Sequence, residues 1–188
     1  MRRISALLMM LLTACFCGCQ SEESTLRPAI EFRADLVQAG GCNFSAEVEA
    51  DFGDTTEQFS LYCEAQQDSM DITVTAPATL EGITAHITEN GGRITYEGMS
   101  AEFGLLANGN VSPAAAPAIT AACWQREYIS AAGQEDDGLY RVTYEKDYDE
   151  KRLIVDTWFK NDLPIYAEVC YNNQRILKLT ITDFALNG

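Results

Sequence analysis

The segment NFSAEVEADF, Asn43 to Phe52, alternates apolar and polar residues along its whole length. QFSLYCEA (58–65) and MDITVTA (70–76) repeat this alternation, and shorter runs continue it as far as Leu106. Because successive side chains of a strand point to opposite faces, each run has one apolar and one polar face. The stretch from Phe44 to Leu106 therefore predicts six short strands in an antiparallel meander.

Helical patterns lie on both sides of this meander, and more strands follow it. One helix is expected over residues 25–39, ended by two glycines, with its apolar side formed by Ala29, Ile30, Leu36 and Val37. A second is expected from Ser112 to about Ser130, where a proline follows the first residue. The remaining alternating runs predict four strands at about 139–146, 152–159, 164–172 and 175–184. The chain is thus expected to hold about ten strands and two helices.

The first residues have the features of a bacterial lipoprotein signal. A basic start is followed by a short apolar run and the tetrapeptide LTAC, which ends at Cys15. This arrangement predicts a signal peptide over residues 1–14, lipidation of Cys15 (alternatively Cys19), and a polar tether over 15–24. An ordinary secretory signal with incidental cysteines is the alternative. Acyl chains on one cysteine would anchor the chain to the outer side of the cell membrane without a spanning helix.

The acidic composition limits the kinds of partner that this chain can bind. The formal net charge is −15 at pH 7, and removal of a basic signal would make the chain more acidic. Such a balance argues against nucleic acid as a partner. The size is consistent with one domain, expected over residues 25–188. Four cysteines lie beyond the predicted signal and tether: Cys42, Cys63, Cys123 and Cys170. They allow three disulfide pairings, and free thiols are the alternative.

Catalytic and metal chemistry find little support in the sequence. His86 is the only histidine, so a metal site with two histidines is excluded. It alternates with Ala85 and Ile87 and is expected to face water. The acidic runs 135–137 and 147–150 could hold calcium, although neither has EF-hand spacing. We expect no enzyme activity, no metal and no cofactor.

A sheet of about ten strands is too wide for two helices to cover. Wide sheets twist and curl, so the apolar face must wrap around the helices, close on itself, or stay partly open. An open apolar cavity would indicate a hydrophobic ligand or partner. A core filled by the protein's own side chains is the other possibility, and counting elements does not decide between them.

Short motifs in one order resemble the LolA/LolB superfamily of lipoprotein carriers. They are ITVTAP (72–77), LEGI (80–83) and ITYEG (94–98), followed by a helix that begins with Ser, Pro and Ala, a strand led by Pro164, and ITDF (181–184). The resemblance covers roughly residues 30–186. It implies a mainly β (α+β) fold: a curved, antiparallel, incomplete barrel with lid helices on its concave face.

The resemblance also implies a function. Members bind acyl chains of lipoproteins or lipids, and this chain looks closest to lipid-anchored relatives. We expect the ligand to contact one set of cavity residues: Phe44, Val48, Phe59, Leu61, Met70, Ile72, Val74, Ile87, Ile94, Tyr96, Phe103 and Trp124. The alternative is a surface-tethered module that holds an envelope protein, of the kind linked to sporulation or germination, with a vestigial cavity.

Overall fold

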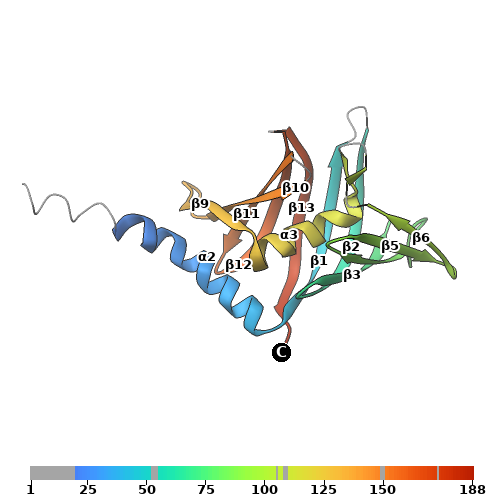
Figure 1. The fold of residues 1–188 in the computed structure, drawn as a ribbon, viewed down its shortest axis with the longest axis horizontal. Helices are drawn as coiled ribbons and strands as arrows, with labels where there is room; N and C mark the ends of the chain where they lie inside the picture. Colours follow the sequence, from blue (N-terminus) through green and yellow to red (C-terminus); the bar gives the residue numbers. More distant parts are fainter. Residues whose placement is uncertain (1–19, 52–54, 105, 108–109, 149–150, 173) are drawn as a thin grey trace, which may run out of the picture.

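The computed structural model describes residues 20–188 except 52–54, 105, 108–109, 149–150 and 173. Helices and strands follow one another along the chain in the order shown in Figure 1. Their bounds are α2 Gln20–Gln38, β1 Gly41–Asp51, β2 Thr56–Gln66, β3 Ser69–Ala76, β4 Thr84–Thr88, β5 Gly91–Tyr96, β6 Met99–Phe103, β7 Leu106–Ala107, β8 Asn110–Val111, the 3₁₀ turn η1 Pro113–Ala115, α3 Ala116–Arg126, β9 Tyr128–Gln134, β10 Tyr140–Tyr148, β11 Lys151–Lys160, β12 Leu163–Tyr171 and β13 Gln174–Leu186.

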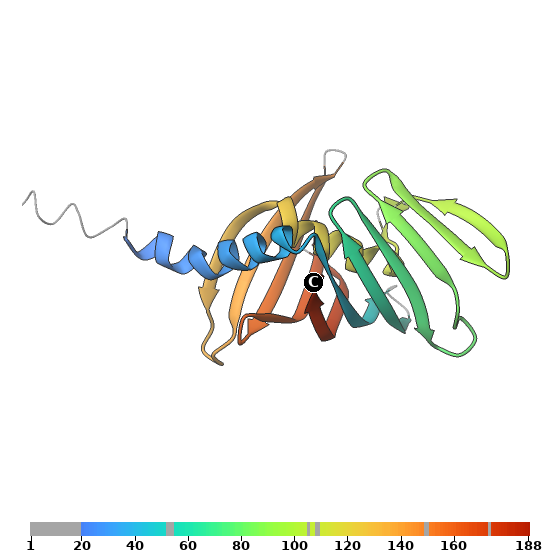
Figure 2. The same ribbon diagram turned by 90° about the horizontal axis from the view of Figure 1, so that it is seen from below.

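Eleven of the strands form one antiparallel sheet. Its order is β6-β5-β4-β3-β2-β1-β13-β12-β11-β10-β9, so β6 and β9 are its two edges and the sheet is not closed. The pairing of β1 with β13 joins the meander to the C-terminal strands. Figures 1 and 2 show the sheet curving around α3, with α2 lying across the β9–β12 half. The predicted fold class, an incomplete antiparallel barrel with helices, is confirmed.

The alternation in the sequence becomes the two faces of this sheet. In β1, Phe44, Ala46, Val48 and Ala50 are buried, and Glu47 between them is exposed. Phe44 is opposite Cys63 of β2, so apolar side chains meet across the strands on the concave face. The hydrophobic core therefore lies between the concave face and the helices.

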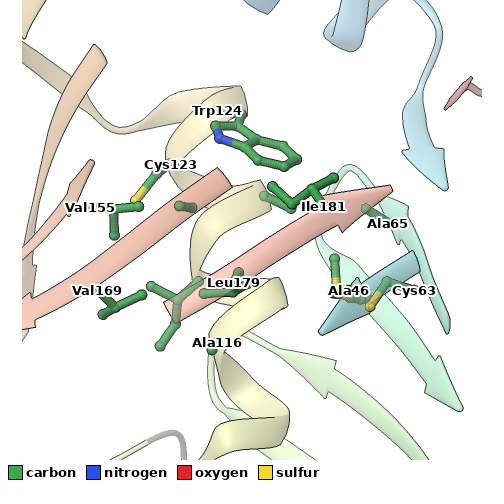
Figure 3. Close-up of a cluster of buried hydrophobic side chains, with 14 of the residues drawn as sticks. Ala46, Cys63, Ala65, Ala116, Cys123, Trp124, Val155, Val169, Leu179 and Ile181 are labelled. Atoms are coloured by element: carbon green, nitrogen blue, oxygen red, sulfur yellow. The ribbon is translucent and has the colours of Figure 1, made fainter. Parts of the chain in front are cut away.

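Helix α3 fills the middle of the concave face. Trp124 is completely buried, and its indole N–H donates to the hydroxyl oxygen of Thr157 over 3.0 Å. Its ring packs edge-on against Phe32 of α2, at a centroid distance of 6.0 Å, and tilted against Phe44 of β1, at 5.6 Å. Figure 3 shows Trp124 and Ala116 gathered with side chains of the neighbouring strands. One aromatic residue thus connects both helices to the sheet.

Three expectations about the helices were wrong. The second helix ends at Arg126 and not near Ser130, because Glu127 is extended and the following residues form edge strand β9, paired with β10. Helix α2 begins at Gln20, inside the predicted tether. Ile30 and Val37, predicted to lie on its apolar side, are 55% and 51% exposed. Only a narrow side of α2 rests on the core, through buried Ala29 and Leu36 and half-buried Phe32.

Candidate functional site

The predicted cavity residues share the concave face, but most of them are covered. Phe44, Val48, Leu61, Met70, Ile72, Val74, Ile87 and Trp124 are all buried. Phe59, Ile94 and Phe103 are half-buried, and Tyr96 is 38% exposed. Burial decreases along the sheet from β1 toward β6. The central part of the face is therefore core, and its β5–β6 end is the more accessible part.

Close packing by α3 explains this closure. Ala116, Ile119 and Cys123 lie on the buried side of the helix and are at most 1% exposed. Because interiors pack densely, their contacts with the strands leave little space at the centre. A filled core, one of the two possibilities that the sequence left open, is thus what the middle of the sheet contains.

A cavity of about 360 Å³ remains at one side of α3, and we call it the hairpin pocket. It lies between the helix, the β2–β3 turn and the β4–β5 turn. Two predicted cavity residues, Met70 and Ile87, line it, and they face each other across β3 and β4. The complete lining is Ala65, Gln66, Gln67, Asp68, Ser69, Met70, Ile87, Thr88, Glu89, Asn90, Ala118, Ile119, Ala121, Ala122, Gln125, Arg126 and Lys146.

Small side chains on α3 create the space. Ala118, Ala121 and Ala122 line the pocket within little more than one helical turn, and side chains three and four residues apart share a helix face. An alanine ends at Cβ, so this side of the helix does not reach the strands. The pocket is therefore lined by apolar and polar residues together, and Met70, Ile87 and Ile119 of its lining belong to the hydrophobic core.

Polar residues surround the mouth of the pocket. Arg126 donates to the backbone oxygen of Gln67 over 2.9 Å and pairs with Glu89 at 2.7 Å and Asp68 at 3.5 Å. Gln125 donates to the backbone oxygen of Gln66 over 3.1 Å. The end of α3 is thereby held to both turns. These ion pairs are largely exposed, and such pairs contribute only about 0–1 kcal/mol each.

Other groups considered from the sequence lie outside this pocket. His86 is exposed, as predicted, and contacts the Asp71 carboxylate at 2.7 Å. Within the described residues, no three His, Cys, Asp or Glu side chains are grouped as metal ligands. Glu135 of the first acidic run accepts hydrogen bonds from Trp158 and Arg141. Nothing in these contacts suggests a reacting group at the hairpin pocket.

The cysteines of the described part are free thiols. Cys42, Cys63 and Cys123 are buried, and Cys170 is half-buried. Both predicted lipidation positions, Cys15 and Cys19, lie outside the described residues. No helix in the described ranges is both long and apolar enough to cross a bilayer.

Sequence reasoning missed the residues that shape the pocket. Gln125 and Arg126 looked like ordinary residues in the middle of a longer helix, because the helix end was placed too late. The stripe formed by Ala118, Ala121 and Ala122 was visible in the sequence, and small residues on one helix face are a signal for space. That signal becomes useful only once the facing turns are known.

Comparison with solved structures gives matches to most of the chain. A LolA superfamily protein from Nitrosomonas europaea is 11% identical, with a TM-score of 0.48 over 89% of this chain and 94% of that one. The lipoprotein LppX from Mycobacterium tuberculosis is 9% identical, with a TM-score of 0.39 over 87% and 96%. The MucA/MucB complex from Pseudomonas aeruginosa matches at 12% identity, with a TM-score of 0.36 over 84% and 56%.

The name of the Nitrosomonas europaea structure includes the LolA superfamily, which the sequence motifs resemble. Neither a protein-family model nor a curated protein matches the sequence.

Proposed function

We propose that this chain is an extracytoplasmic lipoprotein that binds an acyl chain, or another hydrophobic ligand, through the hairpin pocket. Lipid on Cys15, or alternatively on Cys19, would hold it at the cell membrane. The proposal assigns a binding role and no catalytic step. The observation that carries it is the cavity itself, which reaches the core side chains Met70, Ile87 and Ile119 from a mouth of polar residues.

The size and lining suit a chain-like ligand. About 360 Å³ is near the lower end of the range for ligand pockets, roughly 300–1,000 Å³. Each methylene group that leaves water gains about 0.8 kcal/mol, so a short buried length of acyl chain is enough for measurable binding. The polar end of the ligand would stay at the mouth near exposed Arg126, where a donor and water are both accessible.

Filling the pocket tests this role. Ala122→Phe places a ring in the space beside α3, and Ala34→Phe adds the same ring to an exposed position of α2 as the control. We expect the affinity for cis-parinaric acid, followed by its fluorescence, to fall about tenfold or more in Ala122→Phe, as expected for about 1.4 kcal/mol of lost burial. The Ala34→Phe chain should bind like the parent. Equal binding by all three chains would refute the pocket as the site.

A surface-tethered interaction module is the second candidate, and one feature of the convex face favours it. Arg141, Trp158 and Tyr166 are opposite one another on β10, β11 and β12. The Arg141 guanidinium lies 5.3 Å from the centre of the Trp158 ring, whose centroid is 5.1 Å from that of Tyr166. Trp, Tyr and Arg are the residue types enriched at binding hot spots.

Cross-linking from that face distinguishes the two roles. With a photoreactive residue in place of Trp158, the second role predicts one defined protein adduct in intact cells, reduced by Arg141→Ala. The first role predicts no such adduct and undisturbed acyl binding.

A further inference from the structure

A second cavity, of about 390 Å³, lies away from the hairpin pocket. It is bounded by α2, by the turn between β11 and β12, and by the C-terminal end of β13. We call it the aromatic pocket. Its lining is Pro28, Ala29, Glu31, Phe32, Asp35, Tyr140, Phe159, Asp162, Leu163, Phe184, Ala185 and Leu186. It has no residue in common with the hairpin pocket, so the two are separate sites.

Four aromatic rings form much of its wall. The Phe32 ring packs against Phe159 at a centroid distance of 4.9 Å and against Phe184 at 5.8 Å. Tyr140 lies 6.2 Å from Phe159, and its hydroxyl donates to the backbone oxygen of Thr25 over 2.6 Å. The rings therefore support one another, and Tyr140 is fixed at its polar end. Aromatic faces carry partial negative charge and attract cations.

Three carboxylates surround the same cavity. Glu31 and Asp35 come from successive turns of α2, and Asp162 comes from the β11–β12 turn. All three are exposed, and carboxylates in water are negatively charged at neutral pH. Among the residues that the structure describes, no Lys, Arg or His lines this pocket. The charged side chains that line the pocket in the described part of the chain are therefore all carboxylates.

The turn that brings Asp162 to the rim has a defined shape. Asn161 and Asp162 both have positive φ, 51° and 63°, as in the two-residue turns that connect β-hairpins. Asn and Asp tolerate this region better than other residues with a side chain. Beside the turn, Leu163 is 48% exposed, and across the pocket Leu186 is 40% exposed. Apolar surface and negative charge therefore occur together at one opening.

We propose that the aromatic pocket binds an organic monocation, in which an alkylated ammonium group carries an apolar substituent. The ammonium group would meet the ring faces and the carboxylates of Glu31, Asp35 and Asp162, and the substituent would contact Phe184 and Leu186. A fatty acid or a phosphate ester would be repelled by the same carboxylates. This ligand class is distinct from the acyl ligand of the hairpin pocket, and the inference does not depend on that proposal.

Three water-soluble probes of equal chain length test the charge preference on the purified full chain. Calorimetric titration is made with hexyltrimethylammonium, 1-hexanol and hexanesulfonate. We expect the cation to bind about tenfold more tightly than the alcohol, and the sulfonate more weakly than either. Equal binding of cation and alcohol, or tighter binding of the sulfonate, would overturn the proposal.

Neutralising the rim tests the named residues. In the triple variant Glu31→Gln, Asp35→Asn and Asp162→Asn, the affinity for the cation should fall about tenfold while 1-hexanol binding is unchanged. The matched control, Glu57→Gln with Glu64→Gln and Glu81→Gln, changes net charge equally at exposed positions outside the pocket. It should bind all probes like the parent. If both triple variants lose the same affinity for the cation, the attraction comes from the overall charge of the protein and the assigned site is wrong.

A zwitterionic headgroup is a second possible source of the ammonium group. Dihexanoylphosphatidylcholine carries the same trimethylammonium next to a phosphate, which the carboxylate rim repels. We expect it to bind at least about tenfold more weakly than hexyltrimethylammonium. Binding as tight as that of the simple cation would contradict a monocation site and assign the pocket to a lipid headgroup.

Discussion

Arg33 joins the two helices through a single side chain. It donates to three backbone oxygens at the end of α3, those of Cys123 (3.0 Å), Trp124 (2.9 Å) and Glu127 (2.7 Å). The last carbonyls of a helix have no partner within it, and a positive charge there also suits the helix dipole. Arg33 thus replaces the glycine cap that many helices use, and it fixes α3 on the concave face.

Replacing Arg33 by Met tests this role, since Met keeps the apolar stem and removes the donors. We expect Arg33→Met to reduce the free energy of unfolding by about 2–3 kcal/mol, the scale for hydrogen bonds made by a charged group. Urea titration followed by Trp fluorescence gives the value. Arg27→Met, at an exposed position of the same helix, is the control and should change stability by less than about 0.5 kcal/mol. Equal effects of the two changes would rule out a specific cap.

The thiols provide a second prediction at this scale. Burial raises the pKa of Cys42 and of Cys123 to about 12, and it also raises the pKa of Cys63 and Cys170. Only the thiolate reacts, so a raised pKa slows alkylation at pH 8. Among these four, half-buried Cys170 should react first with iodoacetamide, as peptide masses would show. The other three should react only after denaturation, and fast native labelling of Cys42 or Cys123 would contradict their burial.

Helix α3 decides how much of the concave face is core and how much is pocket. Its buried side carries Ala116, Ile119, Cys123 and Trp124, whereas Ala118, Ala121 and Ala122 line the hairpin pocket. The sequence predicted the helix and the place of Trp124 near the sheet. It did not predict where the helix ends. Residues 128–134 form a strand because they pair with β10, and the local sequence does not reveal this tertiary contact.

Arg126, the last residue of α3, lies at the mouth of the hairpin pocket. Arg126→Gln removes the ion pairs with Glu89 and Asp68. The shorter glutamine side chain also loses the hydrogen bond that Arg126 donates to the backbone oxygen of Gln67. Because exposed ion pairs are weak, stability should fall by less than about 1 kcal/mol. The end of α3 should separate more readily from the turns, so the association rate of cis-parinaric acid in stopped-flow mixing should rise severalfold. A slower association rate would mean that Arg126 attracts the ligand and does not restrain the helix.

For the whole molecule, alternation along the chain predicted every strand of the eleven-stranded sheet except edge strand β9. Runs such as 43–52 specify a strand and its buried face together. The incomplete barrel was predicted from the resemblance to the LolA/LolB superfamily, because alternation alone does not decide whether a wide sheet closes. The pockets were not foreseen, because their volume depends on where α3 and α2 stop short of the strands. Of the twelve predicted cavity residues, Met70 and Ile87 line the hairpin pocket. Others, such as Phe44 and Trp124, lie in the filled centre of the concave face.

Native mass spectrometry of the full chain, purified from bacterial membranes in mild detergent, tests acyl binding most directly. The spectrum is compared with that of a delipidated sample to which phospholipid is added back. The account predicts an additional mass that matches an acyl-containing lipid, lost on delipidation, restored on addition, and reduced in Ala122→Phe but not in Ala34→Phe. A chain that carries no such mass and takes up no lipid would contradict the account and leave the interaction module as its role.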